Sequence, residues 1–323
     1  MKQGVRLVSA IGAFGVTIVA SAAVADYPSQ PIQLTVNFGA GGTSDVVARA
    51  IAQEMEEILD TDIVVNNRAG AGGTLGVAET ARSDPDGYHI GTVNMPAISI
   101  IPHLRSVPYD PFEELIQIGA ALPYEYAVIV RDDAPWDTWD ELVDYMLENP
   151  GEVRYGSVGT GTTNHLAMAR MAAEADFEWT HVPFDDGVSN TSAVAGGHIE
   201  VMNNTLAAVA SMLEAGELRA LLVTSERRFD LIPDVPTMEE AGFNFSQISY
   251  MSFAAPAGVP DRERSLLEDA LEEAVASESV KEAAANFDAR PSFISGSDYT
   301  TMLQDMSSEW SQVIDDLEIE VEE

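Results

Sequence analysis

Two glycine-rich segments place small and hydroxyl-bearing residues directly before expected helices. The first segment contains Phe38, Gly39, Ala40, Gly41, Gly42, Thr43, Ser44 and Asp45. The second contains Thr160, Gly161, Thr162, Thr163, Asn164 and His165. Small residues let the backbone approach a ligand, and a helix N-terminus offers unpaired N–H donors at the positive end of its dipole. Such turns suit a carboxylate, although helix capping alone explains either turn taken singly.

Neither segment matches a nucleotide-binding fingerprint. The first segment lacks the lysine of a phosphate-binding loop, and its glycines do not have the dinucleotide spacing. In the second, Asn164 stands where the third glycine of that spacing belongs. A third glycine-rich loop, residues 66–73, is interpreted as structural, with Arg68 pairing to a nearby acid.

The sequence contains few residue patterns that are typical of catalytic or metal-binding sites. It has no cysteine, and its five histidines (89, 103, 165, 181 and 198) show no pair at metal-binding helical spacing. Residues 156–159 lack the spacing of a nucleophile elbow. His165 either donates to a ligand or occupies a helix start. The acid pairs Asp132-Asp133 and Asp185-Asp186 are interpreted as solvated surface. We therefore expect no enzyme activity, no metal and no cofactor.

The charge of the chain excludes several classes of partner. Its 323 residues include 53 Asp and Glu against 16 Lys and Arg, for a formal net charge of −37. This balance excludes a nucleic-acid binder that neutralises phosphates, and it disfavours anionic membrane surfaces. Lys2 and Lys281 are the two lysines of the chain. Abundant acids with few lysines suggest a halophilic host, the alternative being an acidic mesophilic protein.

Residues 1–25 have the pattern of a signal peptide. Lys2 and Arg6 precede an apolar stretch over residues 7–20, and Ala23-Val24-Ala25 supplies a cleavage motif before Asp26. An uncleaved membrane anchor is the alternative, but the apolar stretch is short for a bilayer. With no cysteine to accept a lipid, we expect a free periplasmic protein. Loss of Lys2 and Arg6 would change the net charge from −37 to −39.

Strands alternate with helices along the remainder of the chain. We expect strands over residues 32–38, 62–65, 89–94, 126–130, 152–157, 200–203, 218–224 and 247–255. Helices are expected over residues 44–59, 74–82, 138–147, 163–175, 207–215, 261–277, 279–286 and 297–317. This alternation predicts mostly parallel α/β sheets with flanking helices. We expect one lobe from residues 26–124 plus 248–323 and a second from residues 125–247, with ligand sites where strands lead into helices.

The chain resembles the Bug-type periplasmic receptors of tripartite tricarboxylate transporters. The motifs that carry the resemblance occur in order: residues 27–32 (YPSQPI), 38–45, 67–73 (NRAGAGG), 84–88 (DPDGY), 155–157 and 165–167, 182–184 (VPF), and 255–260 (APAGVP). The resemblance implies a two-lobed, Venus-flytrap fold with mixed sheets. It also implies that residues 38–45 and 160–165 grip a carboxylate, with Phe184 and Asn204 lining the same cleft.

Three positions depart from the usual pattern of that family. Asn37 stands where a proline is common, Asp186 replaces a glycine, and Asn203-Asn204 replaces an aromatic–Asp pair. The last two changes fall in the expected cleft, so the resemblance does not define what the distal end of the ligand contacts.

These observations predict a monomeric periplasmic solute-binding protein that delivers a small organic acid to membrane permease subunits. Dicarboxylates, tricarboxylates, acidic amino acids and aromatic acids all fit such a grip. Two alternatives are a receptor that feeds a sensor kinase and a secreted hydrolase that uses the Ser- and Thr-rich turns. The hydrolase lacks an evident nucleophile–base pair.

Overall fold

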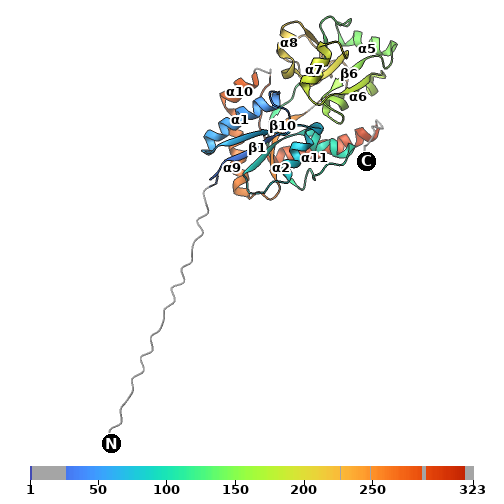
Figure 1. Cartoon of the computed structure of the whole chain (residues 1–323). Helices are drawn as coiled ribbons and strands as arrows, with labels where there is room; N and C mark the ends of the chain where they lie inside the picture. Colours follow the sequence, from blue (N-terminus) through green and yellow to red (C-terminus); the bar gives the residue numbers. More distant parts are fainter. Residues whose placement is uncertain (2–26, 226, 248, 286–288, 317–323) are drawn as a thin grey trace.

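The computed structural model describes Met1 and residues 27–225, 227–247, 249–285 and 289–316. The chain forms two α/β lobes, one carrying α1, α2 and α9–α11 and the other carrying α5–α8 (Figure 1). The predicted signal peptide and its cleavage site, residues 1–25, lie outside the described residues except for Met1. No helix among the described residues combines the length and apolarity needed to cross a bilayer.

The first sheet has six strands in the order β11-β4-β10-β3-β1-β2. Its strands are β1 (Ile32–Val36), β2 (Ile63–Asn67), β3 (His89–Asn94), β4 (Leu115–Pro123), β10 (Tyr250–Pro256) and β11 (Ile294–Ser295). β1 pairs in parallel with β2 and β3, whereas β10 and β4 run antiparallel to their neighbours.

The second sheet has five strands in the order β7-β6-β8-β5-β9. Its strands are β5 (Tyr126–Arg131), β6 (Arg154–Ser157), β7 (Thr180–Pro183), β8 (Val201–Thr205) and β9 (Leu218–Val223). β6 is parallel to β7 and β8, and β5 is antiparallel to β8 and β9. Both sheets are therefore mixed, as the family resemblance implied. The alternation of strands and helices alone had predicted mostly parallel sheets, and that part of the prediction was wrong. Antiparallel pairs arise where the chain passes between the sheets along β4–β5 and β9–β10.

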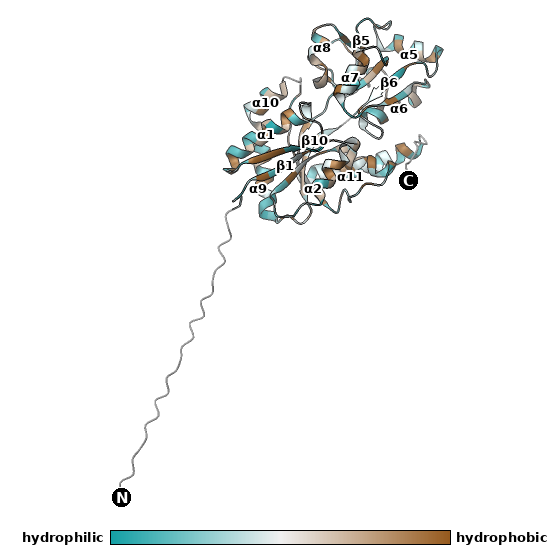
Figure 2. Cartoon of the chain, viewed as in Figure 1, coloured by the Kyte–Doolittle hydropathy of each residue, from teal (hydrophilic) through white to brown (hydrophobic). Residues whose placement is uncertain are grey.

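Helices bury apolar faces on both sides of each sheet (Figure 2). The first sheet is covered on one side by α1 (Thr43–Leu59), α9 (Asp261–Ala276) and α10 (Glu278–Ala285). Its other side carries α2 (Thr74–Ala81), α3 (Met95–Ser99), α4 (Ile101–Leu104) and α11 (Gly296–Asp316). The second sheet lies between α5 (Trp139–Glu148) with α6 (Thr163–Ala175) and α7 (Gly187–Ala195) with α8 (Ala210–Glu214).

Most predicted elements are present within a few residues of their expected ends. The structure adds β4, β7, β11, α3, α4 and α7, which the sequence pattern did not predict. The strand expected from Gln247 begins instead at Tyr250, because the Gln247 N–H bonds to Thr224 O at 2.6 Å. Two helices were expected to end at Asn286 and Leu317, which lie outside the described residues. In the structure these helices are described as far as Ala285 and Asp316.

The two lobes touch on either side of the strands that connect them. Arg170 on α6 lies 3.4 Å from Glu309 on α11, and Arg290 pairs with Asp230. A Cβ placed on Gly161 would lie 2.6 Å from Cδ1 of Leu104, so this turn packs directly against α4 of the other lobe. The second predicted glycine-rich turn therefore lies at the junction of the two lobes.

Candidate functional site

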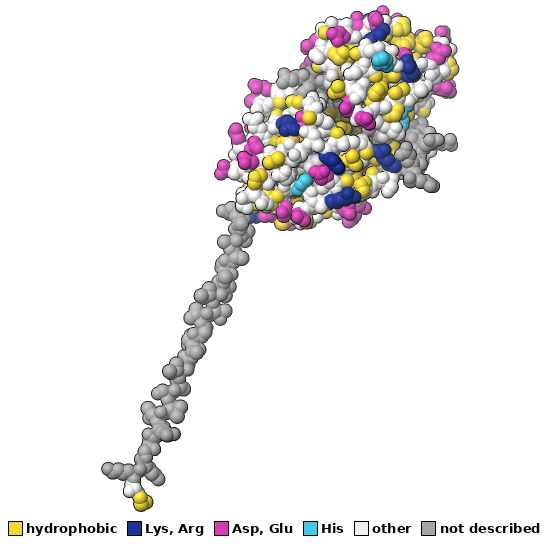
Figure 3. Space-filling model, viewed as in Figure 1, with side chains coloured by type: hydrophobic (Ala, Val, Ile, Leu, Met, Phe, Trp, Pro, Cys, Tyr) yellow, Lys and Arg dark blue, Asp and Glu magenta, His cyan; other side chains and the backbone are white. Residues whose placement is uncertain are grey.

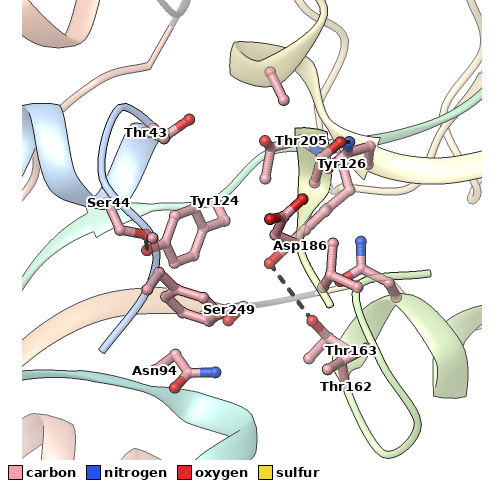
Figure 4. Close-up of a pocket in the computed structure, with 18 of the residues that line it drawn as sticks. Thr43, Ser44, Asn94, Tyr124, Tyr126, Thr162, Thr163, Asp186, Thr205 and Ser249 are labelled. Carbon is pink, nitrogen blue, oxygen red and sulfur yellow. Dashed lines mark hydrogen bonds between the residues drawn. The ribbon is translucent and has the colours of Figure 1, made fainter. Parts of the chain in front are cut away.

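A pocket of about 150 Å³ lies between the two lobes. Residues from both lobes line this pocket. Figure 4 shows that Thr43, Ser44 and Tyr124 lie on one side and face a second group on the other: Tyr126, Thr162, Thr163, Asp186 and Thr205. Three helices, α1, α6 and α7, begin at its wall.

The first turn is held by Asp45, whose side chain points back into the loop. Asp45 Oδ2 accepts from the Gly41 N–H at 2.9 Å, and Oδ1 accepts from Arg49 and Asn67 at 2.9 and 2.8 Å. Burial alone would raise the pKa of Asp45, but these hydrogen bonds and the Arg49 charge lower it. The first N–H groups of α1 have no intrahelical acceptor, as at any helix start, and Gly42 at the N-cap has no side chain that could accept from them.

The second turn is held by its own hydroxyl groups and by two histidines. Thr162 caps α6 by accepting from the His165 N–H at 3.5 Å, and its hydroxyl donates to Gly159 O at 2.7 Å. His165 Nδ1 accepts from the Gly161 N–H at 3.3 Å. The His165 ring stacks on His181 with centroids 4.1 Å apart. His165 therefore supports the turn from behind.

A third helix start, which the sequence analysis missed, completes the wall. Asp186 caps α7 by accepting from the backbone N–H and the hydroxyl of Ser189, both at 2.7 Å. Asn204 Nδ2 donates to Gly187 O and to Thr191 Oγ1, both at 3.0 Å, and so fixes this helix start to β8. Asp185 is exposed as expected. Asp186 lines the pocket, so its interpretation as solvated surface was wrong, and the position in the cleft that the family resemblance implied agrees with the structure.

The structure brings nine of the predicted ligand-binding residues to the pocket: Phe38, Gly39, Ala40, Gly42, Thr43, Ser44, Thr162, Thr163 and Asn204. Six others, Gly41, Asp45, Thr160, Gly161, His165 and Phe184, lie beside or behind it and do not line it. Asn204 lines the pocket, but both of its N–H donors are used within the protein. Ligand contact by these residues stays a prediction.

Asn164 and Asp186 also line the pocket, in keeping with the family resemblance, which placed residues 160–165 in the grip and position 186 in the cleft. Several other lining residues were not predicted from the sequence: Asn94, Pro96, Tyr124, Tyr126, Val158, Gly187, Val188, Thr205, Ala208 and Ser249. Tyr124 donates to or accepts from Ser44 Oγ at 2.6 Å, and Thr163 donates to the Tyr126 hydroxyl at 3.5 Å. These two tyrosines lie on either side of Glu125, in a segment that joins the lobes. Two tyrosines at this spacing could have been recognised in the sequence as candidate lining residues.

Buried amide networks lie beneath the turns and explain two of the unusual residues. The Asn37 side chain donates to Asn94 Oδ1 at 2.6 Å and accepts from the Thr92 hydroxyl at 2.8 Å. The Asn37 N–H also donates to that hydroxyl at 3.0 Å. A proline at position 37 would remove this last donor. In the other lobe, Asn203 bonds to Asn164 and Gln247, at 2.9 Å in each case.

The wall of the pocket combines neutral donors with a single carboxylate. None of the described residues that line it is a lysine or an arginine, and Asp186 is their one acid. Six lining residues in the first turns of the three helices have N–H groups with no intrahelical acceptor: Thr43, Ser44, Thr163, Asn164, Gly187 and Val188. Converging helix N-termini favour a negatively charged group between them. No group of three or more metal-ligating side chains occurs among the described residues.

The buried histidine pair predicts a loss of stability in mild acid. Burial lowers the pKa of His165 to about 4, and burial together with His165 lowers that of His181 to about 3. Unfolded histidine titrates near 6.5, so the unfolded chain binds more protons below that pH and stability falls as the pH decreases. Between pH 6.5 and 5 the expected loss is about 2 kcal/mol per histidine.

Thermal unfolding across this pH range checks the expectation. His181→Gln should show a smaller decrease in melting temperature between pH 7 and 5 than the natural protein. His198→Gln is the matched control, since His198 is exposed. Equal pH dependence in all three proteins would show that the pair does not carry the effect.

Comparisons with known proteins agree with this geometry. Residues 47–319 match the family model for the tripartite tricarboxylate transporter family receptor. A UPF0065 protein in the gbd 5' region of Cupriavidus necator is 31% identical over 312 residues, which cover 96% of this chain and 95% of that protein.

Two solved structures share the fold. The periplasmic binding protein BugD is 26% identical with a TM-score of 0.84, covering 91% of this chain and 99% of BugD. An R. palustris protein solved with adipate is also 26% identical with a TM-score of 0.84, covering 90% and 98% of the two chains. The two mixed sheets and the two lobes are thus those of the periplasmic binding proteins, and the predicted resemblance is confirmed. The chain belongs to the tripartite tricarboxylate transporter receptor family.

Proposed function

We propose that this protein is a periplasmic receptor that captures a small organic carboxylate between its lobes and delivers it to the permease of a tripartite tricarboxylate-type transporter. The N-terminal 25 residues would direct its export and be removed. The mature receptor would act as a monomer without cofactor, metal or catalytic step. The adipate in the R. palustris relative supports a carboxylate ligand for this pocket.

The observation that carries the proposal is the convergence of three helix N-termini on one pocket. The N–H groups that lack an intrahelical acceptor come from both lobes: α1 supplies them on one side of the pocket, and α6 and α7 supply them on the other. A carboxylate has two oxygens and can accept from donors on both sides at once. Binding would therefore favour the arrangement in which the lobes are together.

We further propose that residues 26–124 with 248–323 form one rigid lobe and residues 125–247 the other. An open form would bind the ligand at one turn, and closure would bring up the second set of donors. The contacts between Gly161 and Leu104 and between Arg170 and Glu309 would then belong to the closed form.

Adding bulk at Gly39 tests the position of the site. Gly39 lines the pocket, has an ordinary φ, and a Cβ there would have no atom within 4 Å. Gly39→Ala and Gly39→Val should therefore fold normally while occupying ligand space. We expect calorimetry to show a graded loss of carboxylate affinity, about tenfold or more for valine, which corresponds to about 1.4 kcal/mol.

The ligand-free melting temperature of each variant is the control for folding. Unchanged affinity in a folded Gly39→Val protein would place the ligand elsewhere. Binding should be measured with malate, succinate, glutarate, adipate, citrate, glutamate and benzoate, so that dicarboxylates, a tricarboxylate, an acidic amino acid and an aromatic acid are all represented.

A further inference from the structure

The pocket contains one feature that a plain carboxylate site does not need: the side chain of Asp186. It is the single acid among the described lining residues, and no lysine or arginine lines the pocket to neutralise it. Its side chain lies on the side of Tyr126 and Thr163, facing Tyr124 and Ser44 (Figure 4). An anionic ligand held by the helix starts would therefore lie close to a fixed negative charge.

The hydrogen bonds of Asp186 leave half of its carboxylate available. Both donors from Ser189 go to Oδ1, and each bond is 2.7 Å long. Among the described residues, no donor to Oδ2 is present. One oxygen is thus fixed by the protein, and the other is free to accept from a bound molecule.

Capping alone does not account for a carboxylate at this position. Serine, threonine and asparagine cap helices about as well as aspartate, without bringing a charge into the cavity. Neighbouring Asp185 is exposed and lies outside the pocket, so acidity in this loop could be retained without affecting the ligand. Capping of α7 therefore does not need the negative charge of Asp186, and that charge affects which ligands the pocket can bind.

Electrostatics then separates two kinds of acid. A second ligand carboxylate close to Asp186 would be repelled by its charge, and this repulsion is stronger inside the protein than in bulk water because the local dielectric constant is lower. An ammonium group at the same place would gain attraction of similar size before desolvation, and it would donate to Oδ2 in a charge-assisted hydrogen bond. The three helix N-termini would still hold the carboxylate of such a ligand.

We propose that Asp186 makes this receptor selective for organic acids that also carry a protonated amine, with the ammonium bound to Oδ2 and the carboxylate held by the helix starts. This inference rests on the proposed carboxylate-binding function and narrows its ligand to amino acids in the broad sense. Tyr124 and Tyr126 line the same space and offer ring faces that attract a cation.

The experiment compares matched acids on the natural protein and on Asp186→Asn. Calorimetry with glutarate and adipate gives the affinity for plain dicarboxylates. Glutamate, 4-aminobutyrate and 5-aminovalerate give the affinity for acids that carry an amine at different positions. We expect at least one amine-bearing acid to bind the natural protein tenfold or more tightly than either dicarboxylate. In Asp186→Asn its affinity should fall tenfold or more, and that of the dicarboxylates should rise.

Two further variants separate charge from structure. Asp186→Ser retains a capping hydroxyl and should behave like Asp186→Asn, whereas Asp185→Asn should bind all five acids as the natural protein does. If dicarboxylates bind at least as tightly as the amine-bearing acids and Asp186→Asn changes nothing, the inference is wrong and the proposed function stands. If no acid binds any of the folded proteins, both are overturned.

Discussion

Transfer from 2 M to 0.05 M sodium chloride is expected to lower the melting temperature of this protein by about 10 °C or more. Acidic side chains gather along the rim of the face shown in Figure 3, beside uncharged and apolar areas. The chain as a whole carries a formal net charge of −37. Two like charges 10 Å apart repel by about 0.4 kcal/mol in water, and many such pairs exist in the folded state. The Debye length is about 3 Å at 1 M salt and exceeds 10 Å below 0.1 M, so dilution restores this repulsion.

Several kcal/mol of accumulated repulsion corresponds to a shift of this size, since each kcal/mol moves the melting temperature of a large domain by about 2–4 °C. Sodium chloride is preferable to sulfate, which also strengthens hydrophobic burial. Attraction within the surface ion pairs also strengthens at low salt and would stabilise the folded protein, but exposed pairs contribute only about 0–1 kcal/mol each.

A variant with fewer charges provides the matched control. Asp269, Glu272 and Glu273 lie exposed on α9. Asp269→Asn, Glu272→Gln and Glu273→Gln combined should reduce the salt dependence while leaving the melting temperature in 2 M salt nearly unchanged. A natural protein that is equally stable in both salts would contradict both the repulsion argument and the suggested halophilic host.

Replacement of Asn203 by leucine is expected to cost about 2–4 kcal/mol of unfolding free energy. Asn203 is fully buried in β8 and links α6, through Asn164, to the connecting segment, through Gln247. Leucine has a similar size but removes the donors and acceptors of this network. Each buried polar partner left unsatisfied costs about 1–3 kcal/mol.

Chemical denaturation of the natural and variant proteins measures this cost. Asn66→Leu is the control: Asn66 is an exposed asparagine on β2, where a substitution should change stability by less than about 0.5 kcal/mol. Equal costs at the two positions would show that the network contributes nothing beyond an ordinary surface contact. A marked loss of ligand affinity in Asn203→Leu is also expected, because the network supports the start of α6.

The turns of the pocket were predictable because their chemistry is local. Glycine and hydroxyl residues before an amphipathic helix mark a helix start, and both predicted helices begin at the expected position or one residue from it. The third glycine-rich loop was also interpreted correctly: Arg68 lies 3.5 Å from Glu79.

The third helix start was not predictable in the same way. α7 has the sequence GVSNTSAVA, which is rich in residues of low helix propensity and shows little amphipathic pattern. Its stability depends on tertiary contacts, such as the bonds from Asn204 to Gly187 and Thr191. The pocket role of Asp186 follows from that helix, so local sequence patterns did not distinguish it from the many surface acids. Only the family resemblance, in which Asp186 replaces a glycine, placed this position in the expected cleft.

The long strand β4 was missed for a different reason. Its residues are apolar except for Gln117, and periodicity alone does not assign such a run to a strand. Without β4, the antiparallel neighbour of β10, the alternation of strands and helices suggested sheets more parallel than they are. Long-range pairing therefore set the topology, while local patterns set the elements.

Calorimetric titration of the mature protein with the tightest-binding acid, at 0.15, 0.5 and 2 M sodium chloride, tests the central claim most directly. Helix N-termini act at short range within a closed pocket, whereas the repulsion between a carboxylate and an acidic protein acts at long range and is screened by salt. We predict 1:1 binding with an affinity that stays constant or increases toward 2 M. No binding at any salt, or a steep loss of affinity as salt is added, would contradict a carboxylate site built from backbone donors.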